Sequence, residues 1–364
     1  MRNLLLKRFV FLLTVIFLVS SCKTQPQKFQ DSFLVFGTVV NVTLLNVNEA
    51  LAVKAFREIR ADLKVMHRVW HVWEPGPLMR INAMLAYKNE FSAPPSVLAL
   101  IIEAKKLAIQ SEHLFNPAIG KLIALWGFHS HNRPEIQPSD KEIQKLLQQN
   151  PSLEDVTIEG VRMNNHNSAV KIDLGGVAKG YAVDRLLLSL KQKGIHNALI
   201  DTGGDLKVIG KHFDRPWRVA IRDPRGDIAH GANNRVTPNK KNSFVATIDL
   251  KDNEAAFTSG DYERYFTNKK NNDRHLHHII DPRTGYPATG TQSVTVLHHN
   301  GATADAAATA LFIAGPTQWV KIAKKMGLKN VLLIDSEGKV HLSKSMQQRV
   351  KFEQQREIIE VVQL

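Results

Sequence analysis

"KIDLGGVAKGYAVDR" (Lys171–Arg185) carries information about both the fold and the chemistry of this chain. It is typical of a strand end, a tight glycine turn and a helix start. Gly175 and Gly176 have no side chains, so a ligand can approach the backbone closely there. The free N–H groups of the following helix favour an anion, and Lys179 adds a movable positive charge. The stretch indicates a diphosphate site. It matches neither the Walker pattern nor the Rossmann fingerprint, however, and a glycine turn needed only for packing explains it as well.

The N-terminal residues are typical of a bacterial lipoprotein signal. Basic residues precede an apolar run, Phe9–Val19, that is short for a membrane span. The small residues "LVSS" then lead to Cys22, which is the single cysteine of the chain. We predict a signal peptide over 1–21, acylation of Cys22 and a lipid-anchored tether over 22–32. An ordinary secretory signal with a cysteine nearby is the alternative.

The composition limits the classes of partner. The 364 residues carry a formal net charge of +14, which suits nucleic acid, anionic lipid or a phosphorylated ligand. The basic residues are dispersed, and an exported lipoprotein rarely meets nucleic acid. We therefore expect no nucleic-acid partner. Without Cys22 the chain has no cysteine, so its core must form without disulfides, as one large domain or two.

The rest of the chain alternates extended and helical patterns, which predicts a mixed α+β fold without repeats. The polar stretch 226–243 reads as a surface excursion. The expected strands lie over 33–47, near Lys171, Ala198, Trp217 and Phe244, and over 292–299 and 330–335. The expected helices lie over 48–70, over 96–113, after the capping box of Ser139 and Glu142, over 303–314 and over 318–327.

"ATADAAATALFIAG" places Asp305 and Thr309 four residues apart at a helix start. That spacing puts a carboxylate and a hydroxyl on one helix face, and both are oxygen ligands that Mg²⁺ accepts. A simpler explanation is also open. Asp305 would then be a favourable charge at a helix N-terminus, and Thr309 a buried hydroxyl bonded within its own turn.

"HHIIDPRTGYP" contains a turn preceded by His277 and His278. Such a histidine is commonly structural, but it can also act as a general base. A transition-metal site with His275 is disfavoured, because His275 and His277 would share one face of a strand while His278 points away. Trp73 and Trp126 stand near loops, where an aromatic ring stacks on a planar ligand or, more commonly, belongs to the core.

Five runs occur together and in one order: "NPAIGKLIALWGF", "IDLGGVAKGYAVD", "TSGDYERYF", "HHIIDPRTGYPA" and "ADAAATALFIAG". In this combination the sequence resembles the FAD:protein FMN transferase (ApbE) family, from about Phe36 to the C-terminus. The resemblance implies one domain over 33–364, a mixed α/β architecture related to the T-fold, with an FAD cleft between two lobes.

The resemblance also implies an activity. Family members move the FMN half of FAD onto a threonine hydroxyl of a target protein, require Mg²⁺ and release AMP. Their targets are typically subunits of membrane electron-transfer complexes. The protein would be lipid-anchored to a bacterial membrane and face the periplasm. Three alternatives remain: a hydrolase that converts FAD to FMN and AMP, a non-catalytic FAD-binding lipoprotein, and a lipoprotein with a degraded site that serves as a partner surface.

The residue roles that follow come from the resemblance alone, by position. His278 and Asp305 correspond to catalytic residues, and His278 would assist the acceptor hydroxyl. The Mg²⁺ ligands would be Asp305, Thr309 and a backbone oxygen near Gly176. The FAD contacts would be Phe36, Trp73, Phe115, Asn116, Asp173, Lys179 and Ile280. Three runs depart from the family pattern. They are "FNPAIG", where the family often has "FDPTVG"; "FGT", where it usually has "MGT"; and "HVWEPGP". These departures bear on cofactor affinity more than on chemistry.

Overall fold

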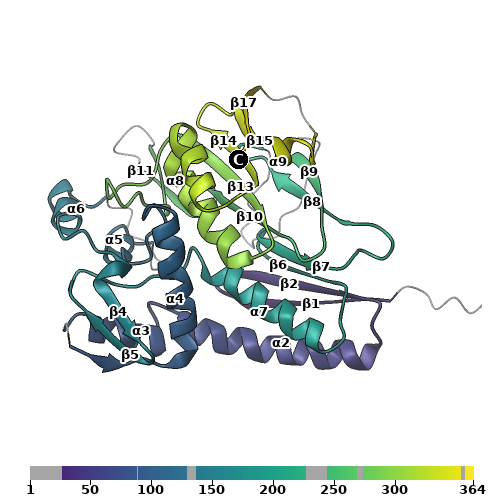
Figure 1. Ribbon diagram of the computed structural model, residues 1–364, viewed down its shortest axis with the longest axis horizontal. Coiled ribbons are helices and arrows are strands. Elements are labelled where there is room, and N and C mark those ends of the chain that lie inside the picture. The colour runs from purple at the N-terminus through teal and green to yellow at the C-terminus, as the bar shows by residue number, and fades with distance from the viewer. Residues whose placement is uncertain (1–26, 88, 129–136, 227–243, 269–273, 354–356) are drawn as a thin grey trace, which may run out of the picture.

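The computed structural model describes residues 27–364 except 88, 129–136, 227–243, 269–273 and 354–356. The centre of the molecule is a nine-stranded sheet with long helices packed along it (Figure 1). Neighbouring strands are antiparallel except the last pair, which is parallel. In spatial order the strands are β1 (Lys28–Val35), β2 (Thr38–Leu45), β6 (Ala198–Thr202), β7 (Leu206–Ile209), β10 (Ala255–Gly260), β13 (Thr291–His298), β14 (Asn330–Asp335), β15 (Val340–Ser343) and β17 (Ile358–Val362).

Helices and three small sheets surround this sheet, so the predicted mixture of α and β structure is confirmed. The helices are α2 (Glu49–Trp70), α3 (Pro77–Leu85), α4 (Pro95–Gln110), α5 (Gly120–Leu125), α6 (Asp140–Leu147), α7 (Ala178–Gln192), α8 (Gly301–Lys325) and α9 (Lys344–Gln347), with a 3-10 turn at Leu153–Asp155. The small sheets are β16 (Val350–Phe352), β9 (Phe244–Leu250) and β8 (Trp217–Arg222); β3 (Phe91–Ser92), β5 (Arg162–Asn165) and β4 (Val156–Glu159); and β11 (Tyr265–Asn268) with β12 (Arg274–His277).

Both faces of the central sheet are buried at its inner strands, of which β13 is an example. On β13, Val294 and Val296 point into the main core, which the sheet forms with helices α2, α4, α7 and α8. Leu297 of the same strand points the other way, into a second core that contains Trp217 of β8 and Val245 of β9. Side chains alternate across a strand, so a strand with cover on both faces is apolar along its length. The strand β13 follows this rule only in part, because Ser293 and Thr295 alternate with the two valines and are nevertheless buried.

The extended structure predicted over 33–47 is present, but a turn that was not predicted divides it into the two strands of a hairpin. Val35 of β1 pairs with Thr38 of β2, which leaves Phe36 and Gly37 as a two-residue turn. Both have positive φ, 56° and 71°, as the favoured tight hairpin turn requires. The strand β1 also begins inside the predicted tether over 22–32. The predicted signal peptide and Cys22 lie outside the described residues.

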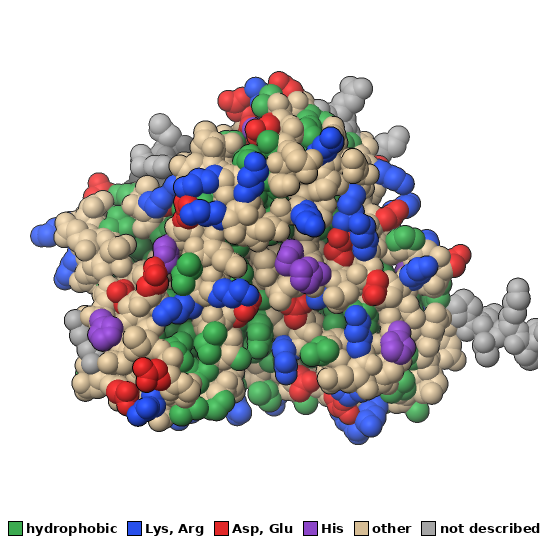
Figure 2. Space-filling view, viewed as in Figure 1, with side chains coloured by type: hydrophobic (Ala, Val, Ile, Leu, Met, Phe, Trp, Pro, Cys, Tyr) green, Lys and Arg blue, Asp and Glu red, His purple; other side chains and the backbone are tan. Residues whose placement is uncertain are grey.

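The glycine stretch also differs from its prediction. Lys171 is not in a strand but makes an isolated bridge to Ile119, and a turn leads from there into α7. The two helices predicted over 303–314 and 318–327 are the two parts of α8, separated by a kink at Gly315 and Pro316. Most of the predicted surface excursion, 227–243, lies outside the described residues. Among the helices of the described ranges, none combines the length and the apolar character that crossing a membrane requires. On the face shown in Figure 2, the Lys and Arg side chains are scattered among acidic and apolar ones.

Candidate active site

The glycine turn brings Gly176 against two predicted site residues. A Cβ atom at Gly176 would lie 3.2 Å from Cε2 of Phe115 and 3.3 Å from the Thr309 hydroxyl oxygen. Before the turn, the Asp173 carboxylate accepts a hydrogen bond of 2.8 Å from the Gly175 N–H, which closes the loop. Burial raises the pKa of Asp173. The structure therefore places the Gly176 backbone, Phe115 and Thr309 at one point.

Helices α7 and α8 cross backbone to backbone beside this turn. A Cβ atom at Gly180 would fall 2.1 Å from the Gly301 carbonyl oxygen, so only glycine permits this approach. The Gly180 N–H donates to Asp305 Oδ2 at 3.0 Å. The spacing of the motif "AKGYA" thus serves helix packing and also directs the Asp305 carboxylate toward α7.

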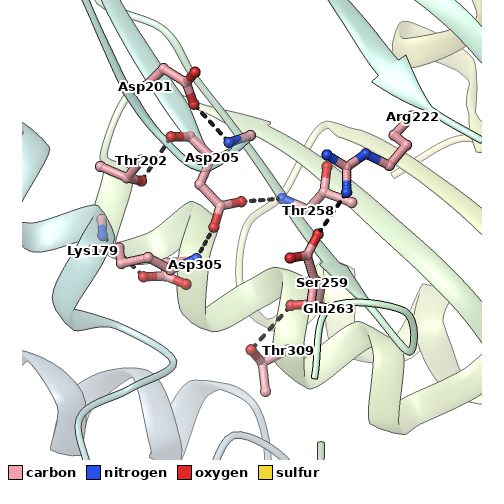
Figure 3. Close-up of polar contacts among 12 residues, drawn as sticks. Lys179, Asp201, Thr202, Asp205, Arg222, Thr258, Ser259, Glu263, Asp305 and Thr309 are labelled. Carbon is pink, nitrogen blue, oxygen red and sulfur yellow. Dashed lines mark hydrogen bonds and ion pairs between the residues drawn. The ribbon is translucent and has the colours of Figure 1, made fainter. Parts of the chain in front are cut away.

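Asp305 and Thr309 lie on one face of α8, as their spacing predicts. The Asn300 side chain caps the helix by accepting from the Thr303 N–H at 2.7 Å. The Thr309 hydroxyl lies 3.2 Å from that of Ser259 on β10 (Figure 3). Asp305 is only 5% exposed, and its burial, opposed by the charge of Lys179, raises its pKa to about 7. A favourable charge at the N-terminus of α8 does not fully explain Asp305, because its carboxylate accepts a hydrogen bond from α7 and not from the end of its own helix.

Lys179 is not the movable charge that the sequence predicts, since it forms an ion pair with Asp205 (Figure 3). The other oxygen of Asp205 accepts from the Thr258 N–H at 2.8 Å. Burial alone would lower the pKa of Lys179, but the carboxylates of Asp205 and Asp305 raise it, so the amine stays charged. Asp205 was not predicted. The signal that could have found it is the glycine pair after a strand in "DTGGDLK", which resembles the Lys179 turn.

His278 follows β12 with one ring nitrogen unused. Its backbone N–H donates to the Arg264 carbonyl at 3.1 Å. Its ring packs on Phe128, and Nδ1 is buried without a hydrogen-bond partner in the part of the chain that the structure describes. Burial lowers the pKa of His278 well below its ordinary value, and Arg264, His277 and Lys179 lower it further. A neutral imidazole at neutral pH can accept a proton.

His277 is structural. Its Nε2 lies 2.9 Å from the Ala288 carbonyl oxygen, and Nδ1 accepts from the Ile279 N–H at 3.3 Å. Because both ring nitrogens of His277 are engaged, the structure gives no support to a metal site shared by His275, His277 and His278. The side chain of His275 lies outside the described part.

Two predicted cofactor contacts, Phe36 and Trp73, lie near the C-terminal end of α2. The Phe36 ring stacks on Trp70 with centroids 6.3 Å apart and planes 10° apart. The Lys171 amine lies 3.9 Å above the Trp73 ring. The side chains of Phe36 and Trp73 are half-buried, so each keeps an exposed part for a planar ligand.

The remaining predicted residues are held mainly by the protein itself. The Asn116 amide donates to the Pro151 carbonyl at 2.9 Å and accepts from the Ala118 N–H at 2.9 Å. Ile280 is buried and bridges to Pro287. Their contact with a cofactor stays a prediction. Trp126 is a core residue, fully buried, and donates to the Gly285 carbonyl at 2.7 Å.

A second group of possible metal ligands lies at the C-terminal end of α2. One ligand atom each from His67, His71 and Glu74 lie within 4.8 Å of one another. However, Nδ1 of His71 already accepts from the N–H groups of Trp73 and Glu74, at 3.2 and 2.9 Å. The neutral ring therefore carries its proton on Nε2, toward Glu74, and offers no free lone pair there. We interpret this cluster as a cap of the chain reversal after α2.

Comparison with known proteins identifies this arrangement. Residues 36–332 match the model of the ApbE family, which is more than half of the chain. The chain belongs to the ApbE family. It is 41% identical over 324 residues to the "FAD:protein FMN transferase" of Rhodobacter capsulatus, which covers 88% of this chain but only 58% of that relative. The Haemophilus influenzae protein of the same name is 27% identical, with 88% of this chain and 90% of the relative covered.

Solved structures of the ApbE family share the fold. The ApbE protein of Thermotoga maritima is 29% identical, with a TM-score of 0.77, and the match covers 90% of this chain and 100% of that chain. The flavin transferase ApbE of Vibrio cholerae is 27% identical, with a TM-score of 0.74, and 89% and 99% are covered. The predicted fold class and family are therefore confirmed.

Proposed function

We propose that this protein transfers the FMN part of FAD to a hydroxyl group of a target protein and releases AMP. One observation carries the proposal: Asp305 and Thr309 lie on one face of α8, the Thr309 hydroxyl lies against the Gly176 backbone, and the buried Asp305 carboxylate lies near the charged Lys179. Relatives in the same family bear the name of this activity. Because the chain spans about 58% of the Rhodobacter capsulatus relative, other functions of that longer protein are not transferred to it.

The donor set fits Mg²⁺. This ion prefers oxygen ligands, and Asp305, Thr309 and the carbonyl of Gly176 supply a carboxylate, a hydroxyl and a backbone oxygen. Burial disfavours the charged form of Asp305, and a divalent cation beside it would remove that penalty. When bound, Mg²⁺ supplies Lewis-acid stabilisation of the diphosphate.

The residues of this chain then have distinct tasks. The hydroxyl oxygen of the acceptor forms a bond to the phosphorus of the FMN half, the bond from that phosphorus to the bridging oxygen breaks, and AMP leaves. Lys179, held in place by Asp205, offsets negative charge on the phosphates. His278, neutral at neutral pH, accepts the hydroxyl proton. Phe36 and Trp73 offer aromatic surface to the ring systems of FAD.

The location of the reaction is also a proposal. The signal pattern supports a lipid anchor at Cys22 and a periplasmic position, and membership of the family supports acceptor subunits in membrane electron-transfer complexes. Only five residues separate Cys22 from β1, which begins at Lys28. A domain so anchored would work on proteins at the membrane surface. Mass spectrometry of the mature N-terminus checks the lipid, and a comparison of flavin on membrane complexes with and without this protein identifies the acceptor.

An Asp305→Asn variant tests the activity. We expect flavin transfer to an acceptor protein, in FAD and Mg²⁺, to fall at least about 100-fold, because an amide does not supply the charge that holds the cation. Asp62→Asn on the exposed face of α2 is the matched control and should leave transfer unchanged. Undiminished transfer by Asp305→Asn would remove the metal role. Free FMN formed without acceptor would instead support the hydrolase, and intact bound FAD would support the carrier.

A His278→Ala variant tests the proton acceptor separately. Transfer should slow by about 10²–10⁴-fold, a range usual for loss of a general base, while the dissociation constant of FAD stays the same. Equilibrium binding of FAD and single-turnover transfer together measure both quantities. Loss of FAD binding in this variant would make His278 a structural residue.

A further inference from the structure

The segment between β10 and β11 holds three of its four residues firmly. Arg225 binds Asp261 through two hydrogen bonds, of 2.8 and 2.6 Å. Tyr262 is buried, and Glu263 pairs with Arg222 at 3.4 Å. The backbone that carries the fourth residue, Arg264, is therefore fixed on the side of strand β8.

The side chain of Arg264 extends from this fixed backbone into the candidate site. Its Nη2 atom lies 3.3 Å from the point that a Cβ atom on Gly37 would occupy, so the guanidinium lies against the β1–β2 turn. Its carbonyl oxygen accepts the His278 N–H. Burial raises the pKa of Asp173, and the nearby charge of Arg264 opposes that rise. Three parts of the site, the hairpin, the glycine turn and the His278 loop, thus surround one arginine.

This guanidinium is exposed and makes no hydrogen bond or ion pair within the described ranges. The other cations of the site are engaged, since Lys179 is paired with Asp205 and Lys171 lies over Trp73. An arginine on a fixed backbone presents a planar fork of donors that matches the geometry of phosphate oxygens. A free guanidinium in a site for a dinucleotide is thus suited to an anionic group of that ligand.

We propose that Arg264 is a substrate-binding residue that contacts the phosphate of the FMN half of FAD. The inference rests on the proposed function and adds a residue and a point of recognition to it. The choice of this phosphate follows from the neighbours of Arg264. The Arg264 carbonyl accepts the backbone N–H of His278, and His278 would receive the proton of the acceptor hydroxyl. That hydroxyl attacks the phosphorus of the FMN half, so this phosphate is the one expected near Arg264.

Binding of FAD, FMN and riboflavin without Mg²⁺, so that no transfer occurs, tests the proposal. Arg264→Ala should bind FAD and FMN roughly 10- to 100-fold more weakly, the usual effect of losing a charged hydrogen bond. Riboflavin has no phosphate, so its affinity should not change. Arg264→Lys should recover part of the loss, because it restores the charge without the fork. Arg218→Ala, a surface arginine on β8 that pairs with Asp249, is the control.

The outcomes separate this inference from the proposed function. Equal weakening of FAD and riboflavin would overturn the phosphate contact, because a change of shape weakens both. The phosphate contact would also be overturned if Arg264→Ala bound FAD as tightly as the wild type does. In that case, flavin transfer by the wild type would still support the proposed function. No binding of any flavin by the wild type would overturn both. A melting temperature of Arg264→Ala within a few degrees of the wild type shows that the variant is folded.

Discussion

Buried charges with few partners dominate the candidate site at the scale of single residues. Asp305 bonds to one backbone N–H, and Lys179 is held by Asp205. A buried carboxylate is costly unless a positive charge balances it. Lys179 gives part of that balance, and the proposed cation would give the rest. The stability of this region is therefore expected to rise when a divalent cation is added.

His278 makes the stability of the protein depend on pH. Its pKa in the folded protein lies well below its ordinary value of about 6.5, so the unfolded chain binds the proton more readily. Burying the neutral His278 ring is favourable to the folded protein above pH ~6.5, and this contribution to stability is lost as the pH falls below that value. Asp305, with its raised pKa, acts in the opposite direction, so the test compares two proteins: on acidification from pH 7.5 to 5, we expect the wild type to lose stability relative to His278→Gln, as measured by urea unfolding. An equal slope in both proteins would contradict this.

Some site residues could be predicted from the sequence because they lie close together in it. Asp305 and Thr309 share a helix face through their spacing alone. Asp205 and Ser259 could not be found this way. They lie on or next to strands β7 and β10, and only the order of the sheet brings them to helices α7 and α8. Arg264 was missed for the same reason, since its neighbours come from three distant segments.

At the scale of elements, the crossing of α7 and α8 sets the position of the site. Asp184 of α7 accepts from the N–H groups of Gly301 and Ala302, at distances from 2.8 to 3.2 Å, and so caps α8. Lys207 of β7 pairs with the same carboxylate and donates to the His299 carbonyl at 2.6 Å. A carboxylate is favourable at a helix N-terminus. These contacts place the first turns of α8, with Asp305, against the helix that carries Lys179.

A Gly180→Ala substitution tests this crossing. Alanine favours a helix by about 1 kcal/mol over glycine, but its Cβ would fall 2.1 Å from the Gly301 carbonyl oxygen. The helices would have to separate, so we expect a net loss of about 1–3 kcal/mol in the free energy of unfolding, by urea titration. The control is Gly160→Ala, where a Cβ meets nothing within 4 Å and only the positive φ is unfavourable. An increase in stability for Gly180→Ala would contradict the close contact.

At the scale of the whole molecule, the second core joins the C-terminal segment to the central sheet. Arg349, just before β16, binds both oxygens of Glu254 at 2.6 Å and donates to the Asp249 carbonyl at 2.9 Å. The two side chains are only 13% and 9% exposed. This pair connects the start of β10 with the three-stranded sheet. A chain that ends before Arg349 would leave the Glu254 carboxylate buried without its partner.

An Arg349→Met variant measures this connection. Removing one partner of a buried pair leaves an uncompensated charge, which costs about 3–5 kcal/mol in the free energy of unfolding. The double variant Arg349→Met with Glu254→Leu should recover much of that loss, because neither charge remains. Arg218→Met, in an exposed pair with Asp249, should change little. Similar losses for Arg349→Met and Arg218→Met would show that burial does not matter here.

Element types could be predicted from the sequence more fully than their pairing. The long helices and the strands over 292–299 and 330–335 have strong periodic patterns, and the structure contains them. The hairpin at Phe36 was missed because its turn is Phe-Gly and not the usual Asn-Gly, and because β-branched and apolar residues stand on both sides of it. The sheet order, with β10 beside β7 and β13, depends on packing between distant segments, which local patterns do not encode.

The contact between Gly180 and Gly301 has a consequence for how the protein admits its ligand. At this crossing no side chain separates the two backbones, so nothing there can be compressed or rotated to make room. Helices α7 and α8 should therefore travel as one rigid body. A dinucleotide that enters the site should leave the separation of α7 and α8, and with it the positions of the Lys179 and Asp305 backbones, unchanged.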